Sequence, residues 1–455
     1  MRGLMKAAPR MEAAVLIVFA VTILWAGSAF PAEGPGVPKL SLEAGLKMVT
    51  MQNRLIKIAQ REEDVQKAQT RIARAPMLPS VDGSAGQTFL DHRPEGVFDG
   101  FVAPTSDKDF YSYSLSISQT IYDFEGNASR YGASRALLAA SGYDTMRIRN
   151  LVALRFALAY FNLLESDKMV QVAMDEEARL ETHLQDAQNL YEQGVITKND
   201  LLQAEVRISD ARRRLADARN ARDIAASRVN SLLARPLDTE FQPVDVPGNE
   251  VFYPGAPGEG TAPDLRQAWM NAEKNRPELA VIAETLKSVG LEKKAAESEY
   301  YPKFFARGGY EYTKNSFETP NGNFSLIIGM GINLYGGGIT RAEVARTGGE
   351  KSRLLEQRDN VKDDIRLEVK TYALDIEDAL KRMDVTKDAV KQARENLRIN
   401  RIRYEQGVGT ATDVIDALTL LTVAETNRYS ALYDFRKAEA GFLYSQGYDL
   451  AEVYR

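Results

Sequence analysis

One five-residue sequence occurs twice in this chain, as Tyr191-Glu192-Gln193-Gly194-Val195 and as Tyr404-Glu405-Gln406-Gly407-Val408, 213 positions later. In both copies a threonine follows the glycine by three residues, and an aspartate follows the threonine by three: Thr197 and Asp200, then Thr410 and Asp413. Glycine suits the left-handed position just past a helix end. Threonine with an acidic residue three positions on is close to a capping box. Each copy therefore predicts a tight reversal between two antiparallel helices.

A repeat at a fixed distance indicates that one structural unit is present twice. We predict a first repeat at 30–235, a Pro/Gly-rich linker at 236–263 and a second repeat at 264–455. The first repeat is expected to hold strands at about 81–90 and 111–122 and long helices at about 127–191 and 198–234. The second is expected to hold strands at about 303–313 and 324–335 and long helices at about 339–404 and 411–445. A further helix is expected before each strand pair, at 41–75 and 265–299.

The strand and helix predictions depend on hydrophobic periodicity. Residues 111–122 alternate apolar side chains with Ser and Thr, the period of a strand with one apolar face. The loop before them, 91–110, reads as polar. Residues 201–232 carry apolar residues at steps of three and four, a heptad seam on which only Arg222 is charged. At 1.5 Å per residue, helix 127–191 would be about 100 Å long, far longer than a globular core needs.

Composition excludes several classes of function. The chain has no cysteine, which rules out disulfides and thiolate chemistry, and two histidines, His92 and His183, are too few for a histidine-based metal site. The net charge of −5 disfavours binding to nucleic acid through phosphate contacts. The glycines at 329–338 lack the Gly-Lys-Ser/Thr ending of a phosphate loop. We therefore expect no enzyme activity, no cofactor and no metal.

The N-terminus has the pattern of a secretory signal peptide at 1–29. Arg2, Lys6 and Arg10 precede an apolar run at 13–25, and Gly27 and Ala29 supply the small residues of a cleavage site. A membrane anchor is the alternative interpretation. Beyond this segment no apolar run is long enough for a transmembrane helix.

The four predicted strands cannot close a barrel within one chain, because spanning barrels begin at about eight strands. Each strand has about the ten residues that cross a bilayer, and aromatic residues gather near the strand ends. A barrel shared between several subunits is the simplest solution. Two solvated hairpins packed on helices in a soluble protein are the alternative.

At this point the chain resembles the TolC-type outer membrane efflux protein family over nearly the whole of its mature length. The resemblance is carried by Leu42-Glu43-Ala44, Leu78-Pro79-Ser80, Tyr404–Gly407 and Thr412-Asp413-Val414-Ile415-Asp416-Ala417. It implies a mainly α fold with a small β part. It also implies a homotrimer, in which a twelve-stranded outer-membrane β-barrel continues into a periplasmic α-helical coiled-coil barrel. The implied partners are outer-membrane lipid, a periplasmic adaptor protein and an inner-membrane pump.

The resemblance also implies site residues. Two aspartates at this spacing narrow the periplasmic entrance in the family, and here they are Asp413 and Asp416; threefold symmetry would make them stacked acidic rings. The alternative is that Asp413 only favours a helix N-terminus. The first repeat has Asp200 but Gln203, and Gly409 replaces an arginine of the family. The adaptor-docking turns would comprise Gly194, Val195, Thr197, Asp200, Gly407, Val408 and Thr410.

The predicted function is therefore an outer membrane channel of a tripartite efflux pump or a type I secretion system. It would carry small molecules or polypeptides out of the cell. The alternative is a periplasmic coiled-coil adaptor or scaffold without a pore. The sequence leaves the substrate open.

Overall fold

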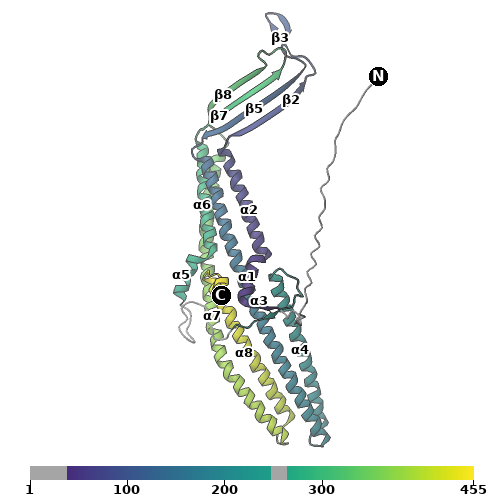
Figure 1. Cartoon of the computed structure of the whole chain (residues 1–455). Helices are drawn as coiled ribbons and strands as arrows, with labels where there is room; N and C mark the ends of the chain where they lie inside the picture. The colour runs from purple at the N-terminus through teal and green to yellow at the C-terminus, as the bar shows by residue number, and fades with distance from the viewer. Residues whose placement is uncertain (1–37, 247–263, 455) are drawn as a thin grey trace, which may run out of the picture. The chain divides into compact units, whose positions relative to one another are not determined.

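The computed structural model describes residues 38–246 and 264–454, and its elements belong to one compact unit, Lys39–Arg455 (Figure 1). The predicted signal peptide and residues 247–263 of the predicted linker lie outside the described residues. Within the described ranges, no helix has both the length and the apolar composition needed to cross a membrane.

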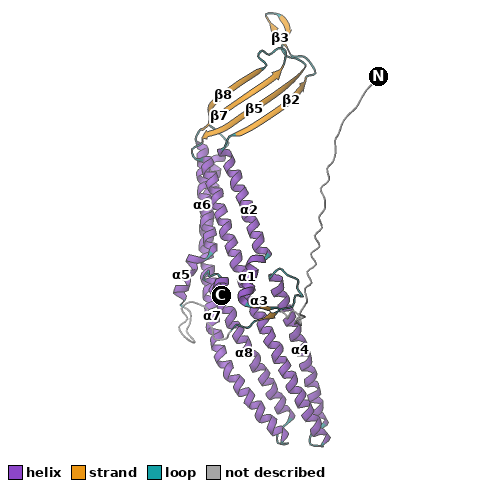
Figure 2. Cartoon of the chain, viewed as in Figure 1, coloured by secondary structure: helices purple, strands orange, loops and turns teal. Residues whose placement is uncertain are grey.

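Two sets of elements follow one another in the same order (Figure 2). The first is α1 (Leu42–Gln52), α2 (Arg54–Arg74), η1 (Ala75–Met77), β2 (Ser80–Phe89), β5 (Asp109–Tyr122), α3 (Gly126–Glu192) and α4 (Lys198–Leu232). The second is α5 (Leu265–Asn275), α6 (Pro277–Glu297), η2 (Ser298–Tyr300), β7 (Lys303–Lys314), β8 (Gly322–Gly331), α7 (Ile339–Glu405) and α8 (Ala411–Ser445). Corresponding helices have identical lengths of 11, 21, 67 and 35 residues. We propose 30–235 and 264–455 as two structural repeats on this basis.

The single helices predicted at 41–75 and 265–299 are wrong, because each is broken once. Asn53 leaves the helical conformation with ψ 135°, and its side chain accepts a hydrogen bond from the Leu55 N–H at 2.9 Å. In the second repeat Arg276 breaks the helix with ψ 119°, and Pro277 begins α6. Proline at the first helical position is favourable, since its missing N–H would have no partner there.

Four strands form one antiparallel sheet in the order β2-β5-β7-β8. Its register places most apolar residues of the four strands on one face, since Val81 lies opposite Ile117, Ile117 opposite Gly308, and Gly308 opposite Leu326. The other face is mainly polar, although Phe305 and Ile327 lie on it, and the Ser80 and Ser118 hydroxyls are 2.7 Å apart there. Strand β8 ends earlier than predicted, at Gly331 instead of residue 335.

The prediction of a polar loop at 91–110 is wrong. This segment holds a small hairpin of β3 (Glu95–Phe98) and β4 (Phe101–Pro104). Asp99 and Gly100 form its turn with φ of 47° and 88°. Asp-Gly between apolar residues is a strong signal for a two-residue hairpin turn with both central φ values positive, so the sequence did carry this information.

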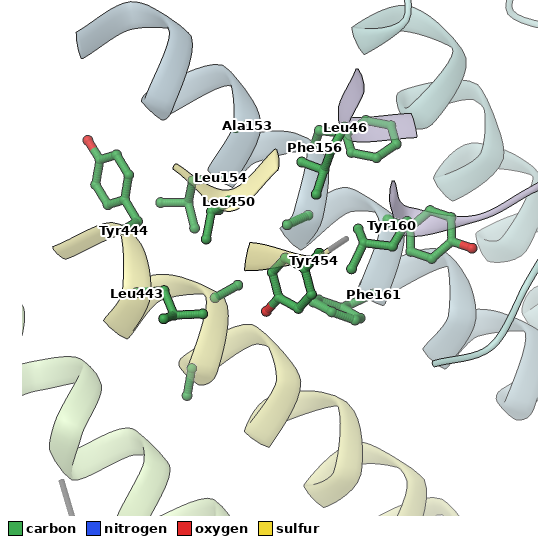
Figure 3. Close-up of a cluster of buried hydrophobic side chains, with 14 of the residues drawn as sticks. Leu46, Ala153, Leu154, Phe156, Tyr160, Phe161, Leu443, Tyr444, Leu450 and Tyr454 are labelled. Carbon is green, nitrogen blue, oxygen red and sulfur yellow. The ribbon is translucent and has the colours of Figure 1, made fainter. Parts of the chain in front are cut away.

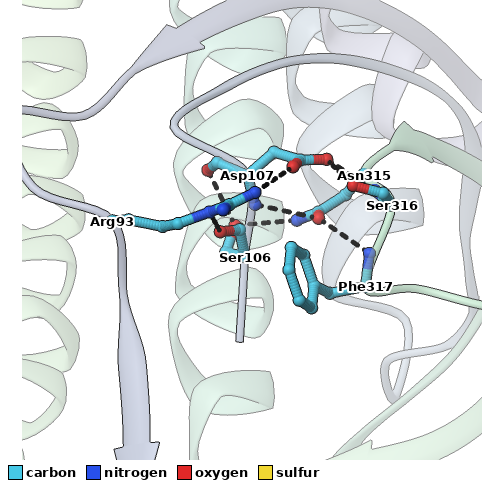
Figure 4. Close-up of polar contacts among 6 residues, drawn as sticks. All are labelled: Arg93, Ser106, Asp107, Asn315, Ser316 and Phe317. Atoms are coloured by element: carbon cyan, nitrogen blue, oxygen red, sulfur yellow. Dashed lines mark hydrogen bonds and ion pairs between the residues drawn. The ribbon is translucent and has the colours of Figure 1, made fainter. Parts of the chain in front are cut away.

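Hydrogen bonds and an ion pair join the strand connections at one end of the sheet (Figure 4). Asp107, from the β2–β5 connection, accepts a hydrogen bond from the Ser316 N–H at 2.6 Å. It also forms an ion pair with Arg93 at 3.0 Å. The buried Asn315 side chain accepts from the Asp107 N–H at 3.1 Å. Arg93 also lies over the Phe317 ring, 5.0 Å from its centre. These contacts join the strand connections of the two repeats.

The main hydrophobic core lies where α1, α3, α7, α8 and the short α9 (Leu450–Val453) meet, and Figure 3 shows part of it. Leu46, Phe156 and Leu443 are fully buried there. Tyr160 donates to the Leu40 carbonyl at 2.7 Å and accepts from the Val244 N–H at 2.9 Å. It thereby holds the parallel pair β1 (Lys39–Leu40) and β6 (Gln242–Pro243), so part of the predicted irregular linker is ordered here.

Beyond this core, α3 pairs with α4 and α7 pairs with α8 as two antiparallel hairpins (Figure 1). Ala204, Ile208, Ala211 and Leu215 of the predicted seam are buried. Arg222, the charged residue on that seam, donates to Asp167 of α3 at 3.0 Å. The seam therefore brings α4 close to α3. The two hairpins extend to the same end of the molecule, where the repeated turns lie (Figure 1).

Candidate functional site

Both repeated turns end their long helix in the same way. Gly194 and Gly407 have φ of 73° and 74°. In the second turn the Val408 N–H donates to the Arg403 carbonyl at 2.9 Å and the Gly407 N–H to the Tyr404 carbonyl at 3.0 Å. The first turn has the equivalent pair of bonds. This is a Schellman motif, in which the left-handed residue satisfies the last carbonyls of the helix. The predicted reversal is confirmed.

Capping boxes begin the returning helices. The Thr197 N–H donates to the Asp200 carboxylate and the Thr410 N–H to the Asp413 carboxylate, both at 3.0 Å. In return the backbone N–H of each aspartate donates to its threonine hydroxyl, at 3.3 and 3.2 Å. Three residues predicted as docking residues, Thr197, Asp200 and Thr410, and the predicted gate residue Asp413 thus have a direct structural role in forming the turns.

Asp413 and Asp416 are both exposed and lie three residues apart in α8. Hydrogen bonds from the Thr410 N–H, and then from the Thr410 side chain, lower the pKa of Asp413. Asp413 is therefore a helix-capping residue, as the alternative interpretation states. The Asp413 carboxylate caps the helix and is still exposed, so its negative charge faces solvent.

The two turns are similar in backbone but differ in their surroundings. Val195 and Val408 project from the turns with exposed fractions of 55% and 65%. The tyrosines diverge, because Tyr191 is 39% exposed and Tyr404 only 3%. Tyr404 belongs to a hydrophobic cluster that draws on all four long helices and includes Leu180, Ile208, Ala211, Val414 and Leu418. This cluster holds the two hairpins together beside their turns.

An ion-pair network, which the sequence analysis missed, adds to this contact. Glu425 of α8 is nearly buried and pairs with Arg179 of α3 at 3.1 Å and with Arg394 of α7 at 3.2 Å. At the equivalent positions of the first repeat the charges are exchanged, and Arg212 of α4 lies 3.5 Å from Glu181 of α3. Charged residues on long helices are usually solvated, so periodicity alone gave no signal for this network.

Metal-ligating side chains do not cluster in the part of the chain that the structure describes. Across residues 38–246 and 264–454, no group of three or more His, Asp and Glu side chains is placed to hold a metal ion. The arrangement offers instead two stiff helical hairpins, exposed apolar turns and exposed carboxylates.

Comparison with known proteins identifies the family. The model of the outer membrane efflux protein family matches residues 46–235 and 269–443, and this chain belongs to that family. The alkaline protease secretion protein AprF of Pseudomonas aeruginosa is 26% identical over 359 residues, which cover 75% of this chain and 71% of AprF. The outer membrane protein TolC of Vibrio cholerae is 23% identical over 378 residues, or 80% of each chain.

The fold comparison agrees with the family. The solved outer-membrane channel OprN superposes with a TM-score of 0.77 at 16% identity, over 89% of each chain. The predicted TolC-type family, outer-membrane location and export-channel function are therefore confirmed. The alternative of a periplasmic adaptor without a pore is set aside.

Replacing the turn glycine tests the backbone constraint. Gly407→Ala should weaken hydrogen-exchange protection of the Val408 amide about five- to thirtyfold, because a left-handed non-glycine residue costs about 1–2 kcal/mol. Gly348→Ala is the matched control, since an added Cβ meets nothing within 4 Å at either position and only Gly407 has positive φ. The control should leave the α7 amides at least as protected. Equal protection in both variants would contradict the assignment.

Proposed function

We propose that this chain forms a homotrimeric channel-tunnel, in which three sheets close one twelve-stranded barrel in the outer membrane and the long helices form a tunnel in the periplasm. The observation that carries the proposal is the open sheet. β2 and β8 are the edge strands of the described sheet, each has ten residues, and each is paired on one side only. Because the four strands alternate in direction, β8 of one copy and β2 of the next would pair antiparallel.

The exposed side chains support the same assembly. Leu115, Phe324, Leu326 and Ile328 lie exposed on the apolar face of the sheet. An apolar outer face with a polar inner face is the pattern of an outer-membrane barrel. On the helices, Leu202, Val206 and Ile224 of α4 and Leu367, Leu374 and Val385 of α7 are also exposed. Contact with neighbouring copies would remove these side chains from water.

Introduced cysteines test the trimer. The chain has no cysteine, so Ser84→Cys on β2 combined with Asn323→Cys or Ser325→Cys on β8 would be the only thiols. We expect the double variants with the correct register to give disulfide-linked dimers and trimers in outer membranes, dispersed by reduction. Each single-cysteine variant is the control and should remain uncrosslinked. A single-chain particle in mild detergent, with no crosslinking in either pair, would overturn the proposal.

The proposed partners are a periplasmic adaptor protein and an inner-membrane pump, within either an efflux system or a type I secretion system. The name of AprF associates that relative with protease secretion. The proposed docking surface is the pair of turns formed by Gly194, Val195, Thr197 and Asp200 and by Gly407, Val408 and Thr410. Val195 and Val408 give each turn an exposed apolar point that capping leaves free.

Charge at the turns tests the docking surface. Val195→Asp together with Val408→Asp should abolish export and adaptor crosslinking, because docking would bury unpaired carboxylates. Trimer formation and outer-membrane insertion should be unchanged. Val97→Asp, at an exposed valine of β3 that belongs to neither turn, is the matched control for the added charge. Full export by the double turn variant would exclude this docking surface.

We further propose Asp413 and Asp416 as the acidic rings of the periplasmic entrance. The low pKa of Asp413 keeps its carboxylate ionised at neutral pH, so the ring would carry charge. Acidic rings attract cations and disfavour anions. The first repeat offers only Asp200, with Gln203 at the second position.

Single-channel recording tests the rings. Asp413→Ala combined with Asp416→Ala should raise conductance, because alanine removes the side chains that would narrow the entrance. It should also raise the half-blocking concentration of a trivalent cation about tenfold, because attraction between charges is lost. Asp200→Ala with Gln203→Ala is the matched control for the loss of a cap and should change the block little. Unchanged conductance and block in the Asp413/Asp416 variant would disprove the assignment.

A further inference from the structure

A row of apolar side chains runs along the exposed side of α2. Leu55, Ile58, Val65 and Ile72 are between 43% and 64% exposed. Single exposed apolar residues are common on protein surfaces, but Ile58, Val65 and Ile72 recur every seven residues. That is the spacing at which one helix packs along another. We call these four residues the α2 stripe, and it has no role in the fold of the chain itself.

The α2 stripe faces away from the helix that α2 packs against. The buried residues of α2 are Ile56 and Thr70, and α3 is the helix that packs along it. Ile58 follows Ile56 by two positions, and Ile72 follows Thr70 by two positions. Two positions are about 200° around an α-helix. The α2 stripe therefore lies nearly opposite α3, where a second neighbouring helix would lie in a ring of helices.

The helix α7 is the other edge of the same layer. Beside the sheet α2 packs on α3, α3 on α6, and α6 on α7. This order, α2-α3-α6-α7, follows the strand order β2-β5-β7-β8. The edge helices α2 and α7 thus accompany the edge strands β2 and β8.

The free face of α7 has a shape that complements the α2 stripe. Thr347 and Leu354 are buried on the inner side of α7. Ala345 and Gly349 each lie two positions from Thr347, and Ser352 lies two positions from Leu354, so all three are on the opposite side. These three residues are exposed, and a Cβ added at Gly349 would meet nothing within 4 Å. Such small side chains leave room for larger ones from a partner helix.

We propose that the α2 stripe of one copy packs against the Ala345–Ser352 face of α7 from the next copy. This inference rests on the proposed trimer and specifies one of its contacts. In the sequence α2 leads into β2 through η1, Leu78 and Pro79, and β8 leads into α7 through residues 332–338. When β8 of one copy pairs with β2 of the next, these short connections bring α7 of the first copy beside α2 of the second.

The spacing of the two faces also matches. The helix α2 runs towards the sheet and α7 runs away from it, so the two would pack antiparallel. Val65 lies seven residues from Ile72, and Ser352 lies seven residues from Ala345. At 1.5 Å per residue both intervals are about 10 Å. Val65 and Ile72 can therefore contact the small residues of one continuous face of α7.

Introduced cysteines test the contact in outer membranes from cells that make the full-length chain. Val65→Cys combined with Gly349→Cys or Ser352→Cys should give dimers and trimers that a short bifunctional maleimide links. Val65→Cys with Lys351→Cys is the matched control, since Lys351 is also exposed. It should crosslink about fivefold less, because its side chain points about 100° around α7 from that of Ser352.

A larger side chain on α7 tests the same contact through stability. Gly349→Leu should lower the temperature at which the trimer dissociates in mild detergent, because leucine would fill the space that the α2 stripe occupies. Gly348→Leu is the matched control, since an added Cβ meets nothing within 4 Å of the same chain at either position. Gly348 lies about 100° around the helix from Gly349, so its variant should dissociate no earlier than the unmodified trimer.

Some results would overturn this contact and leave the trimer standing. These are crosslinking of the β2–β8 cysteine pairs without crosslinking of either α2–α7 pair, capture of Val65→Cys by a different envelope protein, and equal dissociation temperatures for the two glycine variants. Failure of the β2–β8 and α2–α7 pairs together, with a single-chain particle in detergent, would overturn the trimer and this contact with it.

Discussion

The edge strands β2 and β8 each have backbone N–H and C=O groups without a partner on one side of the described sheet. In a membrane every such group must be paired, because no water is present to replace the missing bond. The helices need no such help, since their hydrogen bonds lie within each segment. This difference divides the described chain into a helical part that is complete in its backbone pairing and a sheet with two unpaired edges, which the proposed trimer would close.

The helical part has a constraint of its own, which is to reverse direction between two very long helices. Gly194 and Gly407 make the reversals possible, and the threonine–aspartate pairs begin the returning helices. Side chains then distinguish two turns with nearly the same backbone. Tyr404 is buried in the hydrophobic cluster that joins the two hairpins, whereas Tyr191 is exposed at the surface.

The sequence and the structure agree best where the controlling interactions are local. A left-handed glycine and a capping pair act within about six residues, and strand alternation needs only a period of two. Two features that the sequence predictions missed, the β3–β4 hairpin and the break before α6, also depend on local signals in the sequence. Asp99-Gly100 signals the β3–β4 hairpin, and Pro277 signals the start of α6. The break at Asn53 carries a weaker signal, because asparagine is a common capping residue in many settings.

The amino-acid order was therefore sufficient for the reversals, the main apolar face of the strands and the class of protein. It could not place Glu425 between Arg179 and Arg394, nor His183 beside Tyr404. Those residues come from helices far apart in the chain, and their contacts depend on how α3 packs against α7 and α8. Packing of this kind arises from many weak contacts summed over whole helices, and no short stretch of sequence records that sum.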